Sequence, residues 1–77
     1  MSQKTRTVQW IQGRIIEILS KRCQITTYLA LSSCVLQNVR SIEEQHHLDI
    51  AVALLLSRKE IIREKDKDGF TTYQSAA

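Results

Sequence analysis

Two runs of strand-forming residues near the C-terminus flank a charged turn, and this pattern constrains the fold more than any other feature of the chain. Ile61 to Lys65 form the first run and Phe70 to Tyr73 the second, and both contain β-branched or aromatic side chains that favour strands. Between them, Asp68-Gly69 is typical of a two-residue type I′ turn. The sequence therefore predicts a β-hairpin over about residues 61–74.

The same stretch spells part of a calcium-binding loop. If Gly69 took the sixth position of such a loop, Glu64, Asp66 and Asp68 would take its first, third and fifth positions. The twelfth position requires a carboxylate that binds calcium through both oxygens, and this position is Ser75. We therefore favour the hairpin over a calcium site.

Two helices are predicted from clear local signals. Over about residues 5–22, apolar residues recur at steps of three and four, as on one face of a helix. Ser41 and Glu44 form a capping box, which predicts that a helix begins at Ile42 and continues to about residue 59. Apolar residues extend most of the way round this later helix, so we expect it to be buried on several sides or to face a partner.

The segment between these helices has a weaker pattern. Ile25, Thr26 and Thr27 are β-branched and suit a short bridging strand, but Thr26 or Thr27 could equally cap a following helix. Leu31 and Val35 have helical spacing and predict a helix over about residues 27–39. The choice between strand and cap stays open at this point.

The 77 residues fit one small domain, residues 1–77, without a linker or a repeat. No proline and only two glycines interrupt the chain. Its longest apolar run, Ile50 to Leu56, is far shorter than the roughly 20 residues that a membrane span needs. The first residues also lack the pattern of a signal peptide. We expect an intracellular protein, cytoplasmic or nuclear, that is neither secreted nor associated with a membrane.

The predicted order of helix, short strand, helix, capped helix and hairpin resembles the winged-helix superfamily of DNA-binding domains, also called winged helix-turn-helix. RIIEILSKR resembles the first helix, and LDIAVALLLSRKEIIREKDKDGFTTYQ resembles a third helix followed by a wing. The likeness covers residues 7–22 and 48–74. It implies a mainly α fold in which three helices are followed by a C-terminal two-stranded wing.

The resemblance implies a small transcriptional regulator that binds double-stranded DNA, and the net charge of +3 is compatible with this partner. A domain this short buries only about 60% of its unfolded-state surface, so we also expect support from homodimerisation. The residues expected to contact DNA are basic side chains and two histidines: Lys4, Arg6, Arg14, Arg40, His46, His47, Arg63, Lys65 and Lys67.

The third helix departs from the usual pattern of such DNA-binding domains. Its exposed face is expected to present His46, His47, Asp49, Ile50 and Ala53, and it has no lysine or arginine before Arg58. Phosphates would be repelled by Asp49, and few side chains could read base edges.

The apolar helix segment Ile50 to Leu56, together with Trp10 and Ile16, motivates an alternative function, in which the domain is a protein interaction or dimerisation module that does not bind DNA directly. Its interface would use Trp10, Ile50, Ala53 and Leu54, because a contiguous exposed apolar patch normally marks an interface.

Neither metal chemistry nor catalysis has a recognisable motif. Cys23, Cys34, His46 and His47 lack the spacing of a zinc site, and buried reduced thiols explain the cysteines more simply. No nucleophile–base pair or phosphate-binding glycine loop is recognisable. We expect no enzyme activity, no cofactor and no metal.

Overall fold

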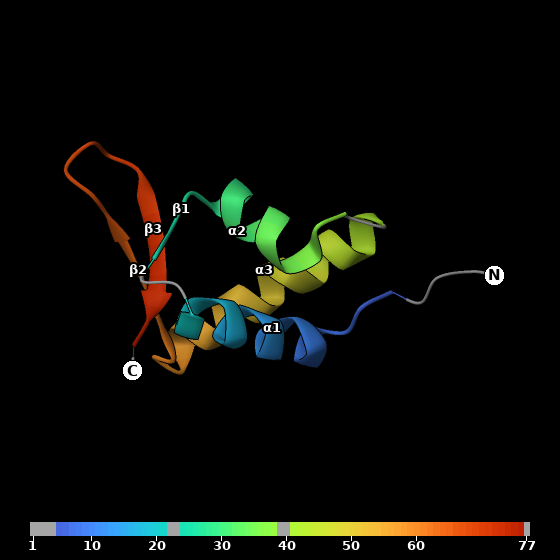
Figure 1. Ribbon diagram of the computed structural model, residues 1–77. Coiled ribbons are helices and arrows are strands. Elements are labelled where there is room, and N and C mark those ends of the chain that lie inside the picture. The colour runs from blue at the N-terminus through green and yellow to red at the C-terminus, as the bar shows by residue number, and fades with distance from the viewer. Residues whose placement is uncertain (1–4, 22–23, 39–40, 77) are drawn as a thin grey trace.

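The computed structural model describes residues 5–21, 24–38 and 41–76 of the chain. It contains three helices and a three-stranded antiparallel sheet, in the order α1 (Val8–Lys21), β1 (Ile25–Thr26), α2 (Tyr28–Leu36), α3 (Ile42–Ser57), β2 (Ile61–Lys65) and β3 (Thr71–Ser75). The sheet lies at one end of the helices, and the β2–β3 hairpin projects beyond them (Figure 1). The three predicted helices and the predicted hairpin are therefore present.

The sheet has one strand more than the predicted two-stranded wing. Its order is β1-β3-β2, with Ile25 opposite Tyr73 and Arg63 opposite Tyr73 on the other side of β3. At residues 25–27 the sequence left a strand and a helix cap open as alternatives, and the structure contains both. Ile25 and Thr26 form β1, and the Thr27 side chain accepts a hydrogen bond of 3.2 Å from the backbone N–H of Ala30 and so caps α2.

The core consists of apolar side chains from all three helices and from each strand. Ile11, Ile15, Ile18 and Leu19 are the buried residues of α1, as the helical spacing predicted. The other buried apolar residues are Ile25, Leu31, Val35, Leu36, Leu48, Ala51, Val52, Leu55, Ile61 and Tyr73. Tyr73 also contacts Tyr28 edge to face, with ring centroids 6.3 Å apart, and so joins the central strand to the start of α2.

Each helix is shorter than predicted, and local backbone geometry explains where each one begins or ends. Thr7 accepts a hydrogen bond from the N–H of Trp10, which caps α1 at Val8 instead of residue 5. α2 ends at Leu36. Gln37 has φ +56° and ψ −61°, and the N–H of Asn38 donates to the Leu36 carbonyl, which closes a strained γ-turn.

The capping serine was predicted correctly, since Ser41 accepts a hydrogen bond of 3.1 Å from the N–H of Glu44. At the other end, Lys59 has φ +60° and the N–H of Glu60 donates to the Leu55 carbonyl at 3.0 Å. This pairing is a Schellman motif, and it closes α3 after Ser57.

The hairpin turn differs from the predicted type I′ turn. Asp66 and Phe70 form the last hydrogen-bonded pair, and the N–H of Gly69 donates to the Asp66 carbonyl at 3.0 Å. Gly69 has φ +86°, but Asp68 does not adopt the positive φ that a type I′ turn requires at both central residues. The loop is therefore a three-residue one, Lys67 to Gly69, in which glycine takes the left-handed position.

Within the described ranges, no helix combines the length and the apolar character needed to cross a membrane.

Candidate nucleic-acid interface

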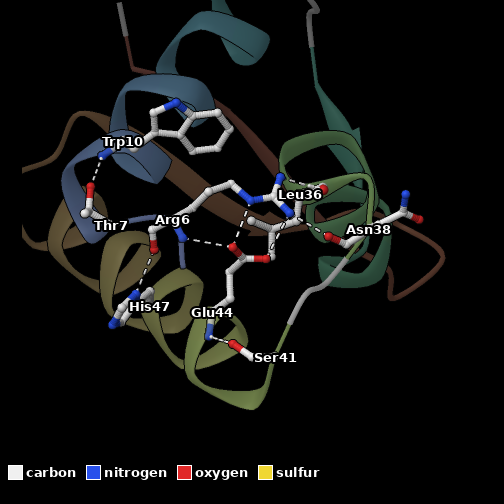
Figure 2. Close-up of polar contacts among 8 residues, drawn as sticks. All are labelled: Arg6, Thr7, Trp10, Leu36, Asn38, Ser41, Glu44 and His47. Carbon is white, nitrogen blue, oxygen red and sulfur yellow. Dashed lines mark hydrogen bonds and ion pairs between the residues drawn. The ribbon is translucent and has the colours of Figure 1, made fainter. Parts of the chain in front are cut away.

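The N-terminal segment is held to α2 and α3 by one buried ion pair, which we call the Arg6–Glu44 clasp (Figure 2). The Arg6 guanidinium donates to both Glu44 carboxylate oxygens at 2.9 Å, and the Arg6 backbone N–H donates to Oε2 at the same distance. The guanidinium also donates to the carbonyls of Leu36 and Asn38, at 2.8 and 2.6 Å. Glu44 is completely buried, and the Arg6 side chain is 13% exposed.

The clasp changes what is expected of Arg6. Its guanidinium holds the end of α2 against the first turn of α3 and lies 5.5 Å from the centre of the Trp10 ring. This group is largely buried and is already engaged by Glu44 and two backbone carbonyls, so little of it faces solvent. Sequence reasoning explained Glu44 as a capping residue and missed its buried ion pair.

The two predicted histidines have different environments. His47 Nδ1 lies 2.8 Å from the Arg6 carbonyl, and since a carbonyl can only accept, Nδ1 carries the hydrogen. His47 Nε2 lies 3.9 Å from Glu43 Oε1. His46 is exposed on α3. His47 is thus an extension of the clasp, and His46 is the histidine that faces solvent.

The basic residues of α1 share one carboxylate. Arg14 Nη1 and Lys21 Nζ lie 3.2 and 3.4 Å from Glu17 Oε1. These exposed contacts are weak individually, but they partly balance both positive charges. Lys4 and Arg40, also predicted to contact DNA, lie outside the described residues.

The hairpin separates its charges by strand alternation. Arg63 and Lys65 lie on the same face of β2 as the buried Ile61, whereas Glu64 lies on the opposite face. Arg63 lines a surface hollow together with Asp49, Ala53 and other residues of α3. The face of the hairpin that carries Arg63 and Lys65 is therefore the one directed toward α3.

The hairpin turn engages one of its own acidic groups. Asp66 Oδ1 accepts hydrogen bonds of 2.9 Å from the N–H groups of Asp68 and Phe70. The Asp66 carboxylate is thus directed into the turn. Lys65, Lys67 and Phe70 remain exposed at the tip, and Phe70 keeps 54% of its surface in solvent. The sequence predicted Phe70 to be the start of a strand. The signal for its exposed position was an aromatic residue directly after the turn glycine.

The outward face of α3 contains Asp49, a carboxylate that is hydrogen-bonded to a tyrosine of α2. The Tyr28 hydroxyl donates to Asp49 Oδ1. Burial raises the pKa of Tyr28 above its ordinary value, and the hydrogen bond and negative charge of Asp49 raise this pKa further. Asp49 therefore has a local partner, but it still places an acid on the face where a DNA-reading helix needs cations.

The predicted interface residues lie in two places. Trp10 is 47% exposed and lines a hollow between α1 and α2 with Val35 and Gln37. Ile50 and Leu54 are 38% and 36% exposed on α3, and Ala53 is exposed beside them.

Within the part of the chain that the structure describes, no group of three or more histidine, cysteine, aspartate and glutamate side chains could hold a metal ion. Cys34 is partly buried, and Cys23 lies outside the described residues.

Comparison with known proteins gives no relative: no family model, no curated protein and no solved structure matches this chain.

Proposed function

We propose that the chain is a winged-helix domain that binds double-stranded DNA mainly through its C-terminal hairpin. The observation that carries this proposal is the separation of charge on the hairpin. Arg63 and Lys65 lie on the α3-facing side, Lys67 lies at the tip, and the Asp66 carboxylate is engaged by the turn. The six charged residues of the hairpin sum to zero, but Arg63 and Lys65 give its α3-facing side a positive charge, while Lys67 and Asp68 are both exposed at the tip.

The arrangement of the elements supports the winged-helix part of the proposal. A short strand precedes α2, the hairpin follows α3, and β3 lies between β1 and β2. β3 thus connects the hairpin to β1, the strand that precedes α2. The tip of the hairpin extends away from the helices, as a wing does (Figure 1).

The proposed role of α3 is limited by its composition. Ile42–Ser57 contains no lysine or arginine, and its exposed residues include Glu43 and Asp49. Contacts from the wing to phosphates would then supply most of the affinity, and few contacts would read bases. We accordingly propose binding with weak sequence preference and strong salt dependence.

The test is fluorescence anisotropy with a short labelled duplex over a series of salt concentrations. Arg63→Ala with Lys65→Ala should weaken binding at low salt and reduce the slope of log affinity against log salt by about 0.9 for each phosphate that the variant no longer neutralises. Arg14→Ala with Lys21→Ala is the matched control: it removes the same charge from α1, and although the sequence predicted Arg14 as a DNA contact, Glu17 partly balances both charges, so this pair should change the slope less. Equal effects of both pairs on the slope, or no duplex binding at low salt, would refute the proposal.

A second function is favoured by the apolar residues on the outer face of α3. Ile50, Ala53 and Leu54 are exposed on a helix face without a basic residue, which suits contact with a protein, including a second copy of this chain. A homodimer formed through this face is compatible with DNA binding by the wing.

Light scattering tests whether the chain forms this homodimer. If α3 mediates self-association, Ile50→Ser with Leu54→Ser should reduce the apparent mass at high protein concentration, whereas Leu29→Ser on α2, where Leu29 is 77% exposed, should not. A wild-type chain that stays monomeric at high concentration would exclude the homodimer.

A further inference from the structure

We propose that Phe70 at the wing tip stacks on a nucleobase that has left the duplex stack at a mismatched or opened step. This inference rests on the proposed function, because it requires the wing to meet DNA. Phe70 is 54% exposed and is absent from the core that the described residues form. Its ring therefore lies outside the hydrophobic core.

The backbone of Phe70 is fixed by the turn that precedes it. Its N–H donates to Asp66 Oδ1, and its carbonyl accepts from the Asp66 N–H, both at 2.9 Å. Gly69 supplies the left-handed residue between them, with φ +86°. The ring thus projects from an ordered turn, and less conformational entropy is lost when a ligand binds to it.

The neighbours of Phe70 indicate the chemistry of its ligand. Lys65 and Lys67 are exposed on the same hairpin tip; of its two aspartates, Asp66 is engaged by backbone N–H groups and Asp68 is exposed. A single aromatic face beside two cations suits a ligand that combines a flat π-surface with phosphates, and an unstacked nucleotide has both. A lipid surface also offers apolar and anionic groups, but one phenyl ring buries too little area there for stable binding.

The test compares two labelled duplexes of equal length, one fully paired and one with a single central mismatch. Wild-type protein should bind the mismatched duplex about tenfold more tightly, as expected for one stacked base. Phe70→Leu, which keeps an apolar side chain, and Phe70→Ala should both abolish this preference while still binding the paired duplex. Phe70→Trp should keep it. A 2-aminopurine at the mismatch should change fluorescence with the wild type and with Phe70→Trp, but not with Phe70→Leu.

Three results would overturn the inference in distinguishable ways. Equal wild-type affinity for both duplexes would exclude base stacking while leaving DNA binding by the wing intact. Binding to neither duplex at low salt would overturn the proposed function and this inference with it. Phe70-dependent sedimentation with anionic vesicles, without a mismatch preference, would assign the tip to a membrane surface instead. Urea unfolding of each variant checks that the fold is unchanged.

Discussion

The Arg6–Glu44 clasp and the tip of the β2–β3 hairpin, proposed above as a wing tip, use similar charged residues in opposite ways. In the clasp, a completely buried carboxylate binds an arginine that is 13% exposed, and the arginine also binds two backbone carbonyls. At the wing tip, Lys65 and Lys67 are exposed while Asp66 is held by two backbone N–H groups. The charges of the clasp are engaged within the fold, and the lysines of the tip face solvent.

This difference shows why a count of basic residues is a poor guide to a binding surface. Arg6 and Lys65 contribute equally to the net charge of +3, but Arg6 is engaged by Glu44 and Lys65 faces solvent. We therefore expect substitutions in the clasp to change stability, and substitutions at the tip to change binding.

The largest effect is expected when the clasp is broken from one side. Glu44→Gln leaves the guanidinium of Arg6 without its buried counter-charge, and we expect the free energy of unfolding to fall by about 3–5 kcal/mol. Urea denaturation near neutral pH measures this change.

Glu43→Gln is the matched control for the clasp, because Glu43 lies in the same first helical turn but its side chain is 70% exposed. It should cost less than about 1 kcal/mol. If the two substitutions have equal effects, the clasp has no special role in stability.

A smaller effect is expected at the turn. Asp66→Ala removes the acceptor for two backbone N–H groups, and because the site is exposed we expect a loss of about 1 kcal/mol. Asp66→Asn keeps a side-chain oxygen and removes the charge, so it should retain more stability and bind the paired duplex at least as tightly as the wild type. Weaker duplex binding by Asp66→Asn would contradict the charge separation proposed for the wing.

A gain in stability is expected where an exposed lysine adopts an unfavourable backbone conformation. Lys59 has φ +60°, which glycine adopts without steric cost, so Lys59→Gly should raise the free energy of unfolding by about 0.5–1 kcal/mol. Arg58 has φ −82°, and Arg58→Gly should therefore be destabilising. Urea denaturation distinguishes the two, and a loss of stability in Lys59→Gly would contradict the backbone argument.

The smallest effect concerns Tyr28 and appears only at high pH. Its pKa is raised above the ordinary value of 10.0, so the stability that its neutral hydroxyl contributes is fully present below pH 10.0 and is lost as pH rises further. The wild type should therefore lose stability relative to Tyr28→Phe as pH rises above this value. A difference in stability between the two proteins that stays constant up to about pH 11 would show that folding does not raise the pKa of Tyr28.

Local signals were sufficient to predict most of the elements. Ser41 caps α3 as predicted, because a side chain that accepts from an N–H three residues later needs no distant partner. The turn was predicted less well: Asp68-Gly69 favours a two-residue loop, but the Asp66 side chain stabilises a three-residue one. The early end of α2 was also missed: Gln37 adopts a positive φ there, and Arg6 binds the carbonyls of Leu36 and Asn38 from outside that helix.

The sequence by itself determined the three helices, the hairpin and the apolar face of α1, because each depends on interactions between residues close together in the chain. The tertiary structure decided which charges are exposed. Arg6 and Glu44 are 38 residues apart and meet only when α1, α2 and α3 pack together. Likewise, Arg63 faces α3 only because Ile61 and Tyr73 fix which side of the hairpin packs on the core. The charge of a side chain follows from the sequence, but whether that side chain is exposed depends on contacts between residues that are far apart in the chain.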